Sequence, residues 1–138
     1  MSLNFSPIFV TDAATYSVKR YNSGCTHVVP DLTQDCAISL PTADTGLEYT
    51  FVFGGIAADT SDWNISTGSD TNYYKGGLLY VDDAPAADSA SGDGNSNSIV
   101  HVLTPEPGTR VHVICDGTYW YLSGVVASAN KPTFADQS

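Results

Sequence analysis

The chain has 138 residues and a mass of 14.6 kDa, which suits one domain with one core. Charged residues make up only 14% of it, and threonine, serine, valine, tyrosine and glycine largely replace glutamate and lysine, which favours strands and turns over exposed helices. The formal net charge of -10 repels phosphate backbones and anionic membranes, so the sequence predicts neither a nucleic acid nor a membrane as a partner.

Residues 1–14 are predicted to form an N-terminal arm. A short apolar run from Pro7 to Val10 follows polar residues and ends at Asp12-Ala13-Ala14, which breaks the pattern. An arm of this kind either frays or docks on a neighbouring molecule. We expect its apolar side chains to bind a partner or another protomer, and these are Phe5, Ile8, Phe9 and Val10.

Alternating apolar and polar residues then predict a series of short strands. The strongest runs from Leu47 to Phe53, where a period of two excludes a helix. Weaker strands are predicted at residues 15–21, 26–29, 36–40, 78–81, 99–103 and 125–127. The stretch from Asp82 to Asn97 has four aspartates and no basic residue, and we expect it to be one long loop.

The clearest local signal is a hairpin, because Asp116-Gly117 separates two alternating runs. A two-residue loop at this point would pair Cys115 with Thr118 and Val113 with Trp120. One face of the hairpin then carries core residues, which are Val111, Val113, Cys115, Trp120 and Leu122. The other face carries His112, Ile114, Tyr119 and Tyr121 and is too aromatic to face water. This face either packs under a loop or a second sheet, or it forms an oligomer interface, where tyrosine is enriched.

The spacing of these strands, roughly one every ten residues, predicts an all-β fold, either an antiparallel β-sandwich or a jelly-roll-like barrel. We expect a single domain at residues 15–127, preceded by the arm at residues 1–14. Residues 128–138 are expected to be a loosely held C-terminal tail.

The sequence carries no pattern that supports catalysis. It lacks the nucleophile elbow, the phosphate-binding loop and the dinucleotide-binding fingerprint. His101 and His112 alternate within predicted strands, which is a structural setting, and most aspartates stand where turns require them. We therefore predict that the protein is not an enzyme and that it has no catalytic residue, no metal and no cofactor.

Calcium is the one ion for which the sequence offers ligands. Asp93, Asn95 and Asn97 place oxygen atoms at the first, third and fifth positions of a calcium loop. However, Ser98 stands where such a loop needs glycine, and Thr104 stands where it needs glutamate. This alternative stays open on the sequence alone.

Three cysteines, Cys25, Cys36 and Cys115, make an odd count without a C-x-x-C pair, so a zinc site is disfavoured. A disulfide between Cys25 and Cys36 remains an alternative. Because the N-terminus has no signal-peptide pattern, free thiols in a reducing cytoplasm are the simplest expectation.

The segment from Val113 to Gly124 (VICDGTYWYLSG) resembles one that recurs in virion structural proteins of tailed bacteriophages, with a strand, a DGT-x-W-Y turn and a closing Ser-Gly. Upstream parts look similar as well, and they are Leu40-Pro41, Thr45-Gly46-Leu47, the strand at residues 49–53 and Asp62 to Ile65. The order of these parts over residues 36–127 carries the resemblance. In phages this module occurs in small capsid decoration (cement) proteins and at the ends of tail fibres.

The resemblance implies a β-rich homotrimer on the virion surface, made in the host cytoplasm. The chain has no shaft with heptads or repeats, so a decoration protein fits better than a fibre. Such trimers would bind the major capsid protein on the outer surface of the head and hold neighbouring capsid subunits together. On this expectation the arm lies on the capsid or on an adjacent protomer, and the aromatic face is buried against another protomer.

The alternative is a receptor- or carbohydrate-binding module of a phage tail fibre. It would use exposed Trp63, Tyr73 or Tyr74 as a platform for a sugar ring.

Overall fold

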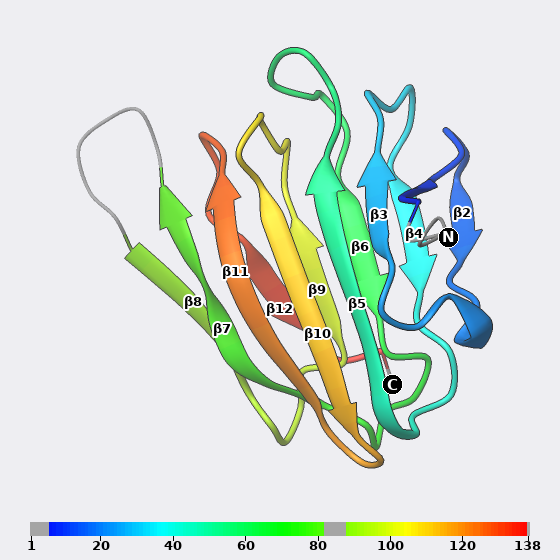
Figure 1. Cartoon of the computed structure of the whole chain (residues 1–138). Coiled ribbons are helices and arrows are strands. Elements are labelled where there is room, and N and C mark those ends of the chain that lie inside the picture. The colour runs from blue at the N-terminus through cyan, green and yellow to red at the C-terminus, as the bar shows by residue number, and fades with distance from the viewer. Residues whose placement is uncertain (1–5, 82–87, 138) are drawn as a thin grey trace.

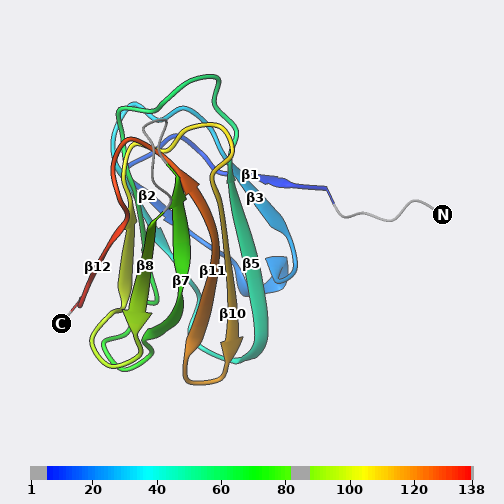
Figure 2. The same ribbon diagram turned by 90° about the vertical axis from the view of Figure 1, so that its left-hand side faces the viewer.

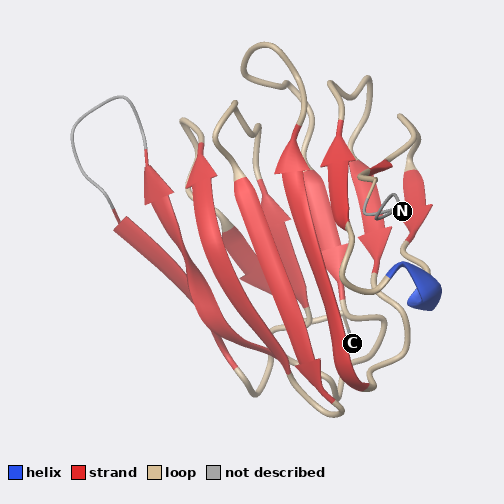
Figure 3. Cartoon of the chain, in the orientation of Figure 1, coloured by secondary structure: helices blue, strands red, loops and turns tan. Residues whose placement is uncertain are grey.

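The computed structural model describes residues 6–81 and 88–137, and it is built almost entirely of strands. Two β-sheets pack face to face, and the edge-on view in Figure 2 shows the two layers. The only helix among the described residues is a single 3-10 turn, η1 (Arg20–Asn22), drawn in blue in Figure 3. The prediction of an all-β sandwich is confirmed.

The larger sheet has seven strands in the order β1-β3-β5-β10-β11-β7-β8 (Figure 1). Their bounds are β1 (Ile8–Phe9), β3 (Thr26–Val29), β5 (Thr45–Phe53), β10 (Arg110–Asp116), β11 (Trp120–Ala127), β7 (Tyr74–Val81) and β8 (Asp88–Asp93). The smaller sheet has five strands in the order β12-β9-β6-β4-β2. Their bounds are β12 (Thr133–Ala135), β9 (Ile99–Val102), β6 (Trp63–Ser66), β4 (Cys36–Ser39) and β2 (Thr15–Ser17).

Both sheets are mixed rather than purely antiparallel, which corrects one part of the predicted architecture. From β1 to β6 the chain changes sheet after every strand. The next strand in the same sheet therefore runs in the same direction as its predecessor, and β1-β3-β5 and β2-β4-β6 are parallel neighbours. The first six strands therefore wind back and forth between the two sheets. Each pair of parallel neighbours is connected through a strand of the opposite sheet, where a helix commonly makes this connection.

The core lies between the two sheets, and the alternation of each strand decides which side chains enter it. In β5 the alternate residues Leu47, Tyr49, Phe51 and Phe53 are buried. Trp63 from the five-stranded sheet and Trp120 from the seven-stranded sheet are also completely buried. The described ends of the chain belong to this sandwich, because β1 pairs with β3 and β12 pairs with β9.

Four strands form where the sequence predicts none, namely β1 within the expected arm, β6, β8 and β12. β8 lies inside the stretch expected to be a loop and pairs with β7, whereas residues 82–87 of that stretch lie outside the described residues. β12 lies in the tail that was expected to be loosely held. Phe134 of β12 packs against the core, and this contact explains why the tail is ordered.

The hairpin has the predicted faces but a different register. Cys115 pairs with Trp120 and Val113 pairs with Leu122, so the turn is centred on Gly117 and Thr118. The Asp116 carboxylate causes this shift, because its Oδ1 accepts bonds from the backbone N–H groups of Thr118 at 2.8 Å and Tyr119 at 2.7 Å. The register moves by two residues in total, so every side chain stays on its predicted face.

His27 is the one histidine that is completely buried, and it lies against the rings of Tyr16, Tyr49 and Phe51. Its Nδ1 donates to the carbonyl oxygen of Cys25 at 3.3 Å, while Nε2 has no partner among the described residues. Burial lowers the pKa of His27 below its ordinary value of 6.5, and the bond to Cys25 opposes this shift only in part.

This buried imidazole predicts a loss of stability in mild acid. Below pH 6.5 His27 is protonated in the unfolded chain but stays neutral in the folded one. The free energy of unfolding therefore falls as the pH drops towards the pKa of His27 in the folded state. The slope for one proton is about 1.4 kcal/mol per pH unit. We expect His27→Leu to flatten the dependence between pH 6.5 and pH 5, measured by urea denaturation at each pH. Equal slopes in the variant and the wild type would contradict the assignment.

Candidate functional site

The outward-facing side of the seven-stranded sheet, called the outer face below, carries most of the large exposed hydrophobic side chains of the described residues. Figure 1 views the molecule from this side, with β10 in the middle of the sheet. Of the eight large hydrophobic side chains that are exposed among the described residues, six lie on it. These are Phe9, Leu79, Val81, Ile114, Tyr121 and Val125. Single exposed apolar residues are ordinary, whereas a group that spans one sheet face marks a contact surface.

One row of side chains crosses the outer face through Arg110. Strand pairing places its members side by side, in the order Phe9, Val28, Val52, Arg110, Val125 and Leu79. Arg110 is therefore an exposed cation whose neighbours in the row are apolar from Phe9 to Leu79, and the polar Ser89 of β8 ends the row. Among the described residues its guanidinium has no carboxylate within ion-pair distance.

The next two rows contain the residues that the sequence predicts as an oligomer interface. His112 lies beside Thr50 and Ser123, and Ile114 lies between Glu48 and Tyr121. The Nε2 atom of His112 contacts Oε2 of Glu48 at 3.2 Å. All four predicted residues, His112, Ile114, Tyr119 and Tyr121, therefore gather on or at the end of the outer face. Their role in binding a protomer stays a prediction.

Polar contacts hold the two tyrosines in place. The Tyr121 hydroxyl donates to Oδ2 of Asp116 at 3.0 Å, and the Lys75 ammonium stands 3.7 Å above the centre of the Tyr119 ring. Backbone N–H groups of Tyr119 and Thr118 lower the pKa of Asp116, so this carboxyl is ionised at neutral pH. The bond to Asp116 raises the pKa of Tyr121, which keeps the phenol a hydrogen-bond donor. The aromatic end of the outer face is thus preorganised rather than mobile.

The arm residues divide into buried and exposed ones. Phe5 lies outside the described residues, and Ile8 is half-buried. Val10 is only 3% exposed, and its N–H donates to the carbonyl of Val28 at 2.9 Å. The expectation that Val10 binds a partner needs correction, because this side chain fills the core of its own chain. Phe9 is 72% exposed and is the described arm residue that remains available to another molecule.

The arm is also tied to the loop that follows β3. The carboxylate of Asp12 accepts bonds from the backbone N–H of Thr33 at 3.1 Å, from its hydroxyl at 3.0 Å and from the side chain of Gln34 at 2.9 Å. Together with the pairing of β1, these bonds fix Phe9 at the edge of the outer face.

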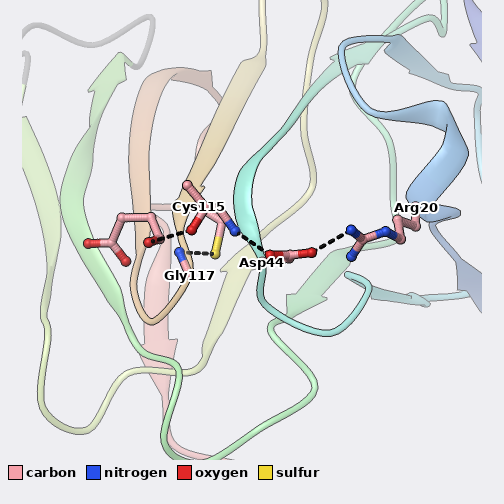
Figure 4. Close-up of polar contacts among 6 residues, drawn as sticks. Arg20, Asp44, Cys115 and Gly117 are labelled. Carbon is pink, nitrogen blue, oxygen red and sulfur yellow. Dashed lines mark hydrogen bonds and ion pairs between the residues drawn. The ribbon is translucent and has the colours of Figure 1, made fainter.

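The three cysteines, Cys25, Cys36 and Cys115, are free thiols in the structure. Burial raises the pKa of Cys115, and the N–H of Gly117, 3.3 Å from its Sγ, opposes this only in part (Figure 4). Figure 4 also shows the ion pair between Arg20 and Asp44 beside the same turn. Burial likewise raises the pKa of Cys36, so both thiols are protonated at neutral pH and act as small core residues.

The loop considered for calcium uses its oxygens to hold its own turn. The Asp93 carboxylate accepts bonds from the N–H groups of Asn95 at 2.8 Å and Ser96 at 2.9 Å, and from the Ser96 hydroxyl at 2.8 Å. The Asn97 side-chain oxygen accepts the N–H of Asp93 at 2.9 Å. These bonds lower the pKa of Asp93. They give its carboxylate a role in holding the turn that requires no bound ion.

Two of the three residues considered for sugar binding cannot serve as a platform. Trp63 and Tyr74 are completely buried, and the hydroxyl of Tyr74 donates to the Ile65 carbonyl at 3.0 Å inside the core. Tyr73 is the only one of the three that reaches the surface.

Residues 6–81 and 88–137 contain no pocket and no group of three or more histidine, cysteine, aspartate or glutamate side chains placed to hold a metal ion. In the same part of the chain, no helix has the length and apolar character needed to cross a bilayer. Comparisons with protein-family models, curated proteins and solved structures found no match to this chain.

Proposed function

We propose that the protein is a structural component of a tailed-phage virion, a decoration protein that binds the major capsid protein on the outer surface of the head. It acts there as a homotrimer that holds neighbouring capsid subunits together. The observation that carries the proposal is the outer face, on which six of the eight large exposed hydrophobic side chains of the described residues gather.

The physical argument begins with the cost of leaving this face in water. Each Å² of apolar surface removed from water contributes roughly 25 cal/mol, so covering several exposed valine, leucine, isoleucine and aromatic side chains stabilises an assembly by several kcal/mol. A chain with a net charge of -10 avoids indiscriminate aggregation through repulsion, and this restricts the face to partners that fit it. Structural proteins that bind through a rigid β-sheet need such a face and need no catalytic group.

The edge of the outer face supports a role for the arm in binding the shell. β1 is the edge strand of the larger sheet, and Phe9 projects from it largely exposed. An aromatic side chain held by a rigid backbone loses little conformational freedom on binding, which makes it a suitable anchor.

Cosedimentation of the purified protein with heads that lack it tests the proposal. We expect the wild type to pellet with the heads at a fixed stoichiometry, and Phe9→Ser to lower the affinity about tenfold or more. Because Phe9 is 72% exposed, the variant should keep the melting temperature of the wild type. Deleting residues 2–10 is a poorer test, since it also removes the buried Val10.

Tyr21→Ser is the matched control, because Tyr21 is 83% exposed but lies in η1 and not in a strand of the seven-stranded sheet. It should leave the affinity for heads unchanged. No binding of the wild type to heads, combined with binding to particular glycans on an array, would instead favour the tail-fibre alternative.

A further inference from the structure

We propose that the outer face around Arg110 binds a second copy of this chain through one corner of that copy, formed by Ile56 and Asp31. The contact is head-to-tail, so Arg110 of each copy meets Asp31 of the next. This inference rests on the proposed function, because it names the contact that would build the trimer.

Arg110 is an unusual cation in this protein. Arg20 pairs with Asp44 and Lys131 pairs with Asp88, while Lys75 lies over the ring of Tyr119. Arg110 and Lys19 have no such partner among the described residues, although the chain carries 15 acidic residues and only five lysines and arginines, and of these two only Arg110 lies on the outer face. An unpaired arginine between apolar neighbours has the composition of an interface anchor, since arginine and aromatic residues dominate binding energy.

Apolar side chains flank Arg110 along its own row, whereas His112, Thr50 and Ser123 of the next row are polar. Val52 of β5 and Val125 of β11 lie directly on either side of it, and Val28 and Leu79 follow on the next strands. A carboxylate that meets Arg110 here would be shielded from water by these side chains, which strengthens the ion pair. The site therefore fits a partner that presents one carboxylate beside one apolar side chain.

The corner formed by Ile56 and Asp31 presents that combination. Ile56 is 91% exposed, the highest value of any large hydrophobic residue described. The Asp31 carboxylate packs against the neighbouring Gly55, where a Cβ atom would lie 2.1 Å from its Oδ1. Asp31 is itself exposed and, among the described residues, has no hydrogen-bond or ion-pair partner. The loops after the parallel strands β3 and β5 place both residues at one end of the sandwich, at the top of Figure 1.

The two surfaces differ, so their pairing is heterologous. Heterologous contacts close into rings when the rotation between copies allows it, and a trimer is such a ring. The outer face spans seven strands, and β10 has seven residues, which gives a surface of about 700 Å² at normal strand spacing and rise. Stable interfaces bury about 800 Å² on each partner, so the outer face has room for the corner of a second copy together with the surface around that corner.

Charge reversal tests the contact in the absence of capsids. We expect sedimentation equilibrium to give an oligomeric mass for the wild type, and Arg110→Glu and Asp31→Arg each to raise the dissociation constant about 30-fold or more. The double variant, R110E with D31R, should restore the oligomer because the two charges are exchanged at every contact. Both positions are exposed, so melting temperatures should show that all three variants are folded.

Lys19→Glu is the matched control, since Lys19 is an exposed cation outside the outer face and the change in charge is the same. It should leave the mass unchanged. A monomeric wild type, single variants that keep the wild-type mass, or a double variant that stays dissociated would each overturn the inference. The proposed function is judged separately, because it fails only if the wild type does not bind heads, which cosedimentation measures.

Discussion

Replacing Trp120 by alanine is expected to lower the free energy of unfolding by about 3–5 kcal/mol, because the variant leaves a large cavity at the centre of the seven-stranded sheet. Trp120 is completely buried, and its ring lies 6.3 Å from that of Tyr49. β11 runs between β10 and β7, so the surrounding backbone is held on both sides and cannot collapse into the space. Since small domains are stabilised by only about 5–15 kcal/mol, this loss leaves the variant close to unfolding at 37 °C.

The variant Trp120→Phe separates the effect of the cavity on stability from the effect of the buried indole N–H. The indole Nε1 is buried and has no partner among the described residues, so the wild type already bears the cost of an unsatisfied donor. Phenylalanine removes that donor and leaves a smaller void, so we expect a loss of only about 1–2 kcal/mol. Urea denaturation monitored by circular dichroism measures both variants. Equal losses for alanine and phenylalanine would mean that cavity volume does not control stability at this position.

The faces of individual strands were predictable from sequence, because the period of two is a local property. Val111, Val113 and Cys115 enter the core, and His112 and Ile114 leave it, as their alternation indicates. The register error in the hairpin did not disturb this result. The Asp116 carboxylate moved the turn by favouring bonds to Thr118 and Tyr119, and a two-residue shift preserves the faces.

The pairing between strands was not predictable in the same way. Alternation is identical in a parallel and an antiparallel strand, so it does not reveal that β1 to β6 form a two-layered coil. β8 has the sequence DSASGD, whose small polar residues have little preference for strands, and it exists because β7 offers a pairing edge. Contacts of this kind arise only once distant parts of the chain have folded together.

This difference between local alternation and long-range pairing also explains which residues of the candidate site could be predicted from sequence. The four hairpin residues were visible as one local face. Val28, Val52 and Leu79 reach this face from strands far apart in sequence, and only the sheet order places them beside Arg110. Trp63 and Tyr74 were interpreted as possible surface aromatics, but each occupies an inward position of its strand and fills the core.

Replacing Gly124 by alanine is expected to lower the free energy of unfolding by about 4 kcal/mol. Gly124 has a φ of +137°, and a Cβ atom there would lie 2.0 Å from the carbonyl oxygen of Arg110 on the paired strand. That oxygen belongs to the backbone of β10, so it cannot move without disturbing the ladder. β11 continues through Gly124 to Ala127, so the strand predicted separately at residues 125–127 is the end of β11, and the glycine permits this close approach.

Gly24→Ala is the control that separates the steric clash with Arg110 from the strain of a positive φ. Gly24 has a φ of +89°, and no atom lies within 4 Å of the position its Cβ would take, so only conformational strain of about 1–2 kcal/mol applies. Thermal and urea denaturation should therefore rank the wild type above Gly24→Ala and Gly24→Ala well above Gly124→Ala. Equal losses would show that strain alone, rather than the contact with Arg110, fixes glycine at position 124. The predicted order would mean that the paired backbones of β10 and β11 have no room to move, and the Arg110 side chain would then stand on a rigid base.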